Sequence, residues 1–143
     1  MTPPIPAATL YSMRSTPNIY VAVIDDDESL CRSMSRLLRA ANFQPITYPS
    51  AEVFLEDTKR PSFDCLLLDI QLIGMSGLDL HQRLSAVKDT TPVIFITAYE
   101  DPEVEAKAEA SACAGYFRKS DSGADIIAAI RRVIGERKRD IAK

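Results

Sequence analysis

The sequence has 143 residues, of which 46% are hydrophobic and 26% charged, values typical of one globular domain. These proportions exclude a disordered chain, and no apolar run approaches the roughly 20 residues of a membrane-spanning helix. The net charge of −3 argues against a domain that binds nucleic acid over its whole surface. Three cysteines without a CxxC spacing indicate a reducing, cytoplasmic compartment.

The two ends of the chain differ in composition from its middle. Residues 1–17 hold four of the nine prolines and a single charged residue, Arg14, and predict an irregular N-terminal arm. Residues 18–138 are expected to form the folded domain, and residues 139–143 a C-terminal tail. The basic residues after position 130 are best explained as complementing the dipole of a last helix.

Short apolar runs alternate with amphipathic stretches between residues 19 and 137. Most of the runs are continuously apolar, which is typical of strands in a parallel sheet that helices cover on both faces. Pro45 suits an edge strand, where a missing N–H costs least. The runs expected to be strands are 20–24, 45–48, 65–68, 93–96 and 116–117.

The stretches between the runs show the apolar spacing of helices, and Asp27, Ser50, Ser76 and Asp101 stand where N-caps are expected. The fourth helix, over residues 103–110, offers only Val104 and alanines for burial and is predicted to be the least firmly docked. Five βα units in order predict an α/β fold: an open, doubly wound, five-stranded parallel sheet with five helices. The apolar side chains on the faces of the first two helices are Leu30, Met34, Leu37, Leu38, Ala41, Val53 and Phe54. Those expected to be buried on the later helices are Leu80, Leu84, Val87, Val104, Ile126, Ile127, Ile130, Val133 and Ile134.

Polar side chains follow four of the predicted strands, at the edge where ligands bind in such sheets. The first strand ends in Asp25, Asp26 and Asp27, the third in Asp69, the fourth in Thr97 and the fifth in Lys119. Acidic residues after a strand often only cap the next helix, as expected here for Asp27. The complete set at one edge is better explained as a functional site.

Three carboxylates at one edge repel each other, because each pair at about 5 Å costs roughly 3 kcal/mol at an effective dielectric of about 20. A divalent cation would offset this repulsion, and oxygen ligands without a nearby histidine or cysteine favour Mg²⁺, with Mn²⁺ as a substitute. A carboxylate beside a metal ion, a lysine and a hydroxyl is suited to phosphoryl transfer. His81, the only histidine, is expected to be a solvated surface residue away from this edge.

Five short segments together resemble the receiver domain of two-component response regulators. The resemblance implies a flavodoxin-like fold with strand order 2-1-3-4-5, and it spans about 120 residues. The segments are residues 23–27, 67–71, 75–77, 95–98 and 115–119.

The resemblance also implies a role for each site residue. Asp69 would accept a phosphoryl group from a sensor histidine kinase or a phosphotransfer protein, and Lys119 would pair with that group. The carboxylates of Asp25, Asp26 and Asp69, with the backbone carbonyl of Gln71, would be the Mg²⁺ ligands.

Signal output is implied by the same resemblance. Thr97 would bind a phosphoryl oxygen and Tyr116 would be the switch aromatic. The output face would be the fourth helix, fifth strand and fifth helix, which would contact an output domain, another partner or a second copy of the chain. The domain would be no enzyme beyond self-phosphorylation and self-dephosphorylation, with no membrane contact, and nucleic acid would bind only through an output domain.

The sequence departs from the family in two places. Ser120 and Ile73 stand where the family usually has proline. Serine at position 120 constrains the placement of Lys119 less, and isoleucine at position 73 predicts a more mobile loop after Asp69. Gln71 and Tyr99 flank the site, and we expect them to tune the lifetime of the acyl phosphate.

Two other functions fit part of the pattern. Asp25 to Ser29 also fit the DxDx[ST] motif of haloacid-dehalogenase-like phosphatases, in which Asp25 would be phosphorylated and Asp27 would be the acid–base. A receiver-like interaction module that is never phosphorylated is the second alternative. The sequence also leaves open whether the domain acts alone or within a larger regulator.

Overall fold

The computed structural model describes residues 18–98 and 100–142. The arm predicted over residues 1–17 and the role expected of Tyr99 lie outside the described residues. Among the described helices, none has both the length and the apolar composition needed to cross a membrane.

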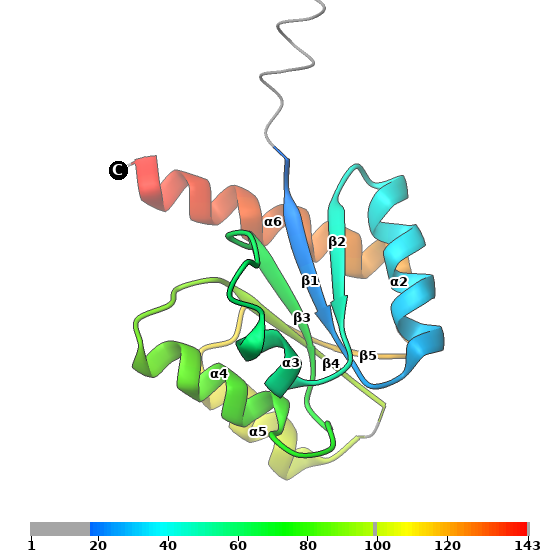
Figure 1. Ribbon diagram of the computed structural model, residues 1–143, viewed down its shortest axis with the longest axis vertical. Helices are drawn as coiled ribbons and strands as arrows, with labels where there is room; N and C mark the ends of the chain where they lie inside the picture. The colour runs from blue at the N-terminus through cyan, green and yellow to red at the C-terminus, as the bar shows by residue number, and fades with distance from the viewer. Residues whose placement is uncertain (1–17, 99, 143) are drawn as a thin grey trace, which may run out of the picture.

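Five parallel strands form one sheet in the order β2-β1-β3-β4-β5, which confirms the predicted fold class and strand order (Figure 1). In the register of the central strands, Val23 pairs with Leu67, and Leu67 pairs with Ile94. Pro45 lies in an edge strand, as predicted. The strands are β1 (Tyr20–Ile24), β2 (Gln44–Tyr48), β3 (Cys65–Asp69), β4 (Val93–Thr97) and β5 (Gly115–Arg118).

Helices cover both faces of the sheet (Figure 1). Side chains of α2 and α6 pack with one set of alternate strand residues, and those of α3, α4 and α5 pack with the other set. This division explains the continuously apolar strands, because both faces of each central strand are buried. The helices are α2 (Glu28–Ala40), α3 (Ala51–Glu56), α4 (Gly77–Ala86), α5 (Pro102–Ala110) and α6 (Gly123–Ala142).

The predicted N-caps are confirmed for the first four of these helices. Asp27, Ser50, Ser76 and Asp101 each accept a hydrogen bond from a backbone N–H of the first helical turn. These bonds satisfy N–H groups that have no partner within the helix, and so they fix where each helix leaves the sheet edge. The predicted boundary at residue 138 lies inside α6 and stays a prediction.

Two expectations about burial were wrong. Val87 is 74% exposed, although it was expected to be buried. Val87 follows the last residue of α4, where the helical face no longer points at the core. His81 was expected in solvent but is buried, with Nε2 at 2.9 Å from the carbonyl oxygen of Ser111 and its ring edge-to-face with Phe95.

The weak docking expected of the fourth helix is confirmed. Within α5 only Ala108 is buried, and Val104 is partly buried. By contrast, α6 buries six apolar side chains on its inner face, and Ile130 among them is fully buried. The helix α5, which connects β4 with β5, is therefore held to the sheet by few buried side chains.

Candidate functional site

The carboxylates of Asp25, Asp26 and Asp69 meet at the edge where β1 and β3 end. Each offers one oxygen atom, and these three atoms lie within 4.8 Å of one another. The strand register explains this, because Ile24 pairs with Leu68 and the next residues along both strands are Asp25 and Asp69. Asp25 and Asp69 are buried, whereas Asp26 is exposed at the rim.

Lys119 joins the two buried carboxylates. Its Nζ lies 3.0 Å from Oδ2 of Asp25 and 3.1 Å from Oδ2 of Asp69. The backbone N–H of Lys119 donates to the carbonyl of Thr97 at 2.8 Å, which extends the pairing of β4 with β5 and directs the lysine to this edge. With serine at position 120 in place of the family's usual proline, Lys119 still reaches Asp69 at the end of β3.

The surroundings of Asp69 act on its pKa in opposite directions. Burial and the neighbouring charge of Asp25 raise the pKa of Asp69 to about 6, although hydrogen bonds from Lys119 and from the backbone N–H of Gln71 oppose this rise. Burial by itself would lower the pKa of Lys119, but the bonds to Asp25 and Asp69 outweigh burial and raise it. At neutral pH the site therefore holds an ionised Asp69 and a charged lysine.

Thr97 and Tyr116 lie on the two strands next to this cluster. Thr97 is the last residue of β4 and is 1% exposed. Tyr116 pairs with Phe95 across the β4–β5 ladder and is half-buried against the core of α3, α4 and α5, and this burial raises its pKa. The two residues expected to act as a switch thus stand on neighbouring strands beside the weakly docked α5.

The donor atoms fit a hard divalent cation. Three carboxylates with one oxygen each within 4.8 Å of the others offer ligands of the kind that Mg²⁺ and Mn²⁺ prefer. Cys31 lies close by, but its Sγ donates to the carbonyl oxygen of Asp25 at 3.4 Å, and burial and Asp25 raise its pKa. A protonated thiol is a poor ligand, so the sulfur does not change the expected metal. Gln71 has an exposed side chain, and its backbone N–H donates to Oδ1 of Asp69 at 3.0 Å.

Two residues that shape the end of β3 and the loop after it were given no role by the sequence. Gly77, at the start of α4, donates its N–H to the carbonyl of Ile70 at 2.9 Å, and a Cβ at this position would lie 2.2 Å from the carbonyl oxygen of Asp69. Only glycine lets α4 begin so close to the end of β3. Glu52 on α3 contacts the loop after Asp69, 23 residues away, and nothing in its local sequence marks that contact.

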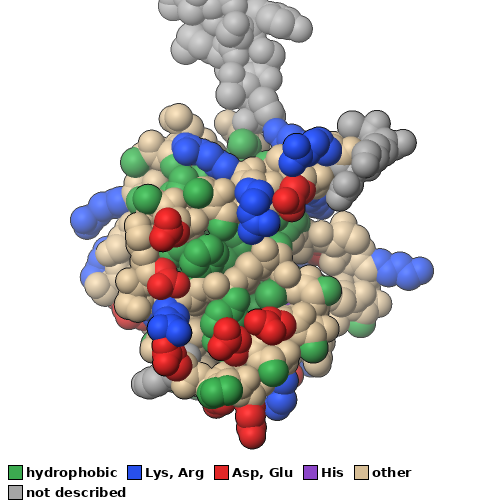
Figure 2. Space-filling view, turned by 180° about the vertical axis from the view of Figure 1, so that it is seen from behind, with side chains coloured by type: hydrophobic (Ala, Val, Ile, Leu, Met, Phe, Trp, Pro, Cys, Tyr) green, Lys and Arg blue, Asp and Glu red, His purple; other side chains and the backbone are tan. Residues whose placement is uncertain are grey.

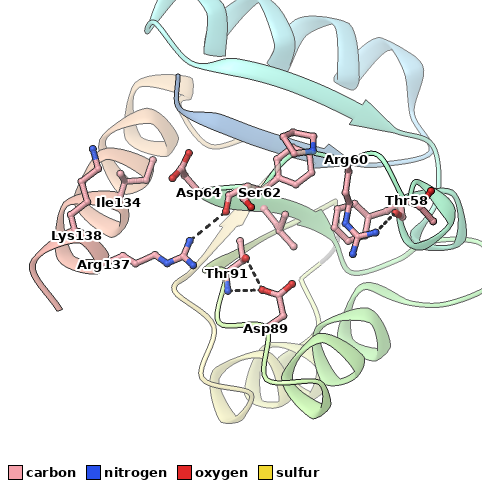
Figure 3. A pocket seen from close by; sticks show the side chains of 13 residues that line it. Thr58, Arg60, Ser62, Asp64, Asp89, Thr91, Ile134, Arg137 and Lys138 are labelled. Atoms are coloured by element: carbon pink, nitrogen blue, oxygen red, sulfur yellow. Dashed lines mark hydrogen bonds between the residues drawn. The ribbon is translucent and has the colours of Figure 1, made fainter. Parts of the chain in front are cut away.

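Cavities lie at both edges of the sheet. One of about 770 Å³ lies at the edge where the strands begin and is lined by charged and polar residues that include Asp64, Asp89 and Arg137 (Figure 3). There Arg137 donates to the carbonyl of Phe63, and Asp89 accepts from Thr91. None of the predicted site residues line it. A cavity of about 500 Å³ borders Asp25 and Asp26 at the edge where the strands end.

Comparison with known proteins gives matches over most of the chain. Residues 21–131 match the response regulator receiver domain family. The response regulator protein TodT of Pseudomonas putida is 31% identical over 114 residues, which are 80% of this chain and 50% of TodT. The transcriptional regulatory protein FixJ of Azorhizobium caulinodans is 31% identical over 115 residues, which are 80% of this chain and 54% of FixJ.

Solved structures show the same fold. The crystal structure of a CheY-like receiver domain protein from Methanospirillum hungatei matches with a TM-score of 0.80 at 19% identity, over 87% of this chain and 99% of that one. The chain spans about half the length of the curated relatives it matches. With its strand order, its acidic edge and the family match over residues 21–131, the chain belongs to the receiver domain family of response regulators.

Proposed function

We propose that this receiver domain accepts a phosphoryl group on Asp69 from a sensor histidine kinase or a phosphotransfer protein. The observation that carries the proposal is the contact of Lys119 with both Asp25 and Asp69, at 3.0 and 3.1 Å, within a cluster of three carboxylates. The phosphatase alternative leaves Asp69 without a role. Asp69 belongs to this cluster and contacts both Lys119 and the backbone N–H of Gln71.

The chemistry follows from the charges at the site. An ionised Asp69 oxygen attacks the phosphorus of a phosphohistidine, so that a P–O bond forms while the P–N bond breaks and its electron pair returns to the imidazole. Lys119 pairs with the phosphoryl oxygens, and the Thr97 hydroxyl donates to one of them. The product is an acyl phosphate on Asp69, which water later hydrolyses; self-phosphorylation and self-dephosphorylation are the only reactions proposed.

Asp25, Asp26 and Asp69, with the backbone carbonyl of Gln71, are the residues that would hold Mg²⁺. When bound, this ion supplies positive charge that offsets both the repulsion among the carboxylates and the charge of the incoming phosphoryl group. The buried carboxylates keep their oxygens fixed through bonds to backbone N–H groups: Asp25 accepts from Asp27 at 2.9 Å, and Asp69 accepts from Gln71.

Output would pass through the face formed by α5, β5 and α6. A phosphoryl group adds about −1.5 to −2 charge beside Lys119, and Thr97 and Tyr116 lie on the strands that lead from the site to this face. The few buried contacts of α5 make it the element that shifts. The partner would be an output domain or a second copy of the chain in the cytoplasm, with nucleic acid bound only through the output domain.

A small phosphodonor tests the proposal without knowledge of the kinase. Wild type, Asp69→Asn and the matched control Asp125→Asn, an exposed carboxylate on α6, are treated with acetyl phosphate and Mg²⁺ and examined by intact-protein mass spectrometry. We expect one added phosphoryl group in wild type and in the control, and none in Asp69→Asn. Phosphate located on Asp25 would favour the phosphatase, and a wild type that stays unmodified would favour the interaction module.

A further inference from the structure

The loop between β3 and α4, residues 70–76, carries Gln71 past the site and has little packing of its own. Leu72 is buried, but the next residue, Ile73, is 84% exposed. Gly74 has φ +86°, in the left-handed region that favours glycine. Two bonds fix the ends of the loop: from the Gln71 N–H to Asp69, and from the Gly77 N–H to the carbonyl of Ile70.

A third bond fixes the far side of this loop and comes from another helix. Oε1 of Glu52, in the first turn of α3, accepts the backbone N–H of Met75 at 2.6 Å. Gly74 also lies against this carboxylate, since a Cβ on Gly74 would lie 2.6 Å from the same oxygen. The bond from Met75 lowers the pKa of Glu52, and the charge of Arg83 adds to this, so the carboxylate is ionised at neutral pH.

We propose that Glu52 is a positioning residue of the phosphoryl-transfer site, which holds the 70–76 loop and thereby fixes the backbone of Gln71 beside Asp69. The inference rests on the proposed function, in which the Gln71 carbonyl is a Mg²⁺ ligand. A hydrogen bond to an ionised acceptor is stronger than a neutral one. Residues that orient metal ligands in this way commonly change metal affinity about 10-fold or more when they are removed.

Glu52 also carries a negative charge at the N-terminus of α3, and this charge stabilises a helix by itself. Two variants separate the roles. Glu52→Gln loses the charge but keeps an oxygen that can accept the Met75 N–H. Glu52→Asp keeps the charge but is one methylene shorter and cannot reach. Glu56→Ala, on the exposed last turn of α3, is the control for a lost carboxylate.

Two measurements report how each substitution of Glu52 changes the loop and the metal site. Hydrogen exchange of the Met75 amide in Mg²⁺-free protein reports the bond itself, and titration with Mg²⁺ reports the geometry of the ligands. For Glu52→Asp and Glu52→Ala we expect exchange to be about 10-fold faster and Mg²⁺ affinity about 10-fold weaker. We expect Glu56→Ala to stay within about twofold of wild type in both measurements. Glu52→Gln keeps the bond with a weaker, neutral acceptor, so we expect it to lie between wild type and Glu52→Ala.

The outcomes distinguish this inference from the proposed function. If wild type neither binds Mg²⁺ nor takes up phosphate, the proposed function is wrong, and wild type alone shows it. If wild type does both and Glu52→Asp matches it in exchange and in affinity, only the role of Glu52 is overturned. If Glu52→Gln behaves like Glu52→Ala while Glu52→Asp behaves like wild type, charge at the helix end acts in place of the hydrogen bond, and the inference is overturned as well.

Discussion

Asp69 is a carboxylate with 4% of its surface exposed, beside a second buried carboxylate and one lysine. Its pKa of about 6 lies above the value of about 3.9 expected in an unfolded chain. The folded protein therefore binds a proton between pH 4 and 6 that the unfolded chain has lost. The free energy of unfolding must fall as the pH rises through this window, and the charge of Asp69 costs stability above it.

Replacing Asp69 with asparagine should remove this cost. In protein freed of Mg²⁺, Asp69→Asn is expected to raise the free energy of unfolding at pH 8 by about 1 to 2 kcal/mol, since water reaches the rim of the site and screens part of the repulsion. At pH 4 the gain should vanish, because Asp69 is already protonated in the folded wild type. Urea unfolding at both pH values measures the difference, and an equal gain at pH 4 and pH 8 would contradict it.

Lys119 has the opposite effect on stability. In Lys119→Met the two buried carboxylates lose the cation between them, and we expect the free energy of unfolding at pH 8 to fall by about 2 to 4 kcal/mol. The loss should be smaller at pH 5, where Asp69 takes up a proton. Lys59→Met, at an exposed position, is the control in the same urea titration. A loss in Lys119→Met that does not depend on pH would show that the methionine harms packing and that the ion pairs contribute little.

The site residues could be predicted from sequence because each follows an apolar run, and parallel strands bring their carboxyl ends to one edge. This argument alone was enough to predict that Asp25 and Asp69 lie at the same edge of the sheet. The burial of His81 could have been found from its spacing, since it lies four residues after Gly77 and three before Leu84 on the buried face of α4. Its polarity argued for solvent, and the carbonyl of Ser111 that satisfies it is 30 residues away.

Among the helices and strands around the site, the first residue of α4 lies directly against the last residue of β3. Gly77 leaves no space for a side chain, because a Cβ there would lie 2.2 Å from the carbonyl oxygen of Asp69. The helix can therefore begin directly against β3, and its N-cap Ser76 turns the chain away from the site. The sequence predicted the start of α4, because Ser76 has the character of an N-cap. It could not predict the contact between Gly77 and the carbonyl of Asp69, because that contact depends on how the helix packs against the strand.

Gly77→Ala should force the end of β3 and the start of α4 apart. We expect the free energy of unfolding to fall by about 1 to 3 kcal/mol and the rate of phosphorylation by acetyl phosphate to fall with it, because Asp69 is displaced. Thermal unfolding and the mass assay measure the two effects.

The matched control is Gly135→Ala in α6, where a Cβ would meet no atom within 4 Å. There alanine should stabilise the protein by about 0.5 to 1 kcal/mol, because it favours the helix more than glycine does. If both substitutions stabilise the protein, the close approach at Gly77 is not a constraint.

Over the whole molecule, packing is distributed unevenly. The strands β1, β3 and β4 are buried along almost their entire length between two apolar cores, whereas α5 contributes one buried side chain. Charge is uneven too: in Figure 2 acidic side chains lie mostly toward the edge where the strands end, and basic ones mostly toward the other edge. Negative charge from phosphate would therefore arrive at the edge that is already acidic, next to the least tightly packed helix.

This unevenness predicts that α5 opens without the rest of the domain. Its amides should exchange with deuterium at least about 100-fold faster than those of β3, because they need only local opening, whereas β3 exchanges when the whole domain unfolds. The bond from His81 to Ser111 holds the C-terminal end of α5, so His81→Ala should speed exchange in α5 further.

Gly135→Ala separates local from global opening. A variant that stabilises the whole domain by about 0.5 to 1 kcal/mol slows the exchange of amides that open by global unfolding by about two- to fivefold. Amides that open locally keep their rate, since the stabilised helix α6 stays folded in both states of that opening. We therefore expect slower exchange in β3 and unchanged exchange in α5, measured by native-state hydrogen exchange. If both slow by the same factor, α5 unfolds together with the sheet, and a shift of this helix on phosphorylation would have to involve the core as a whole.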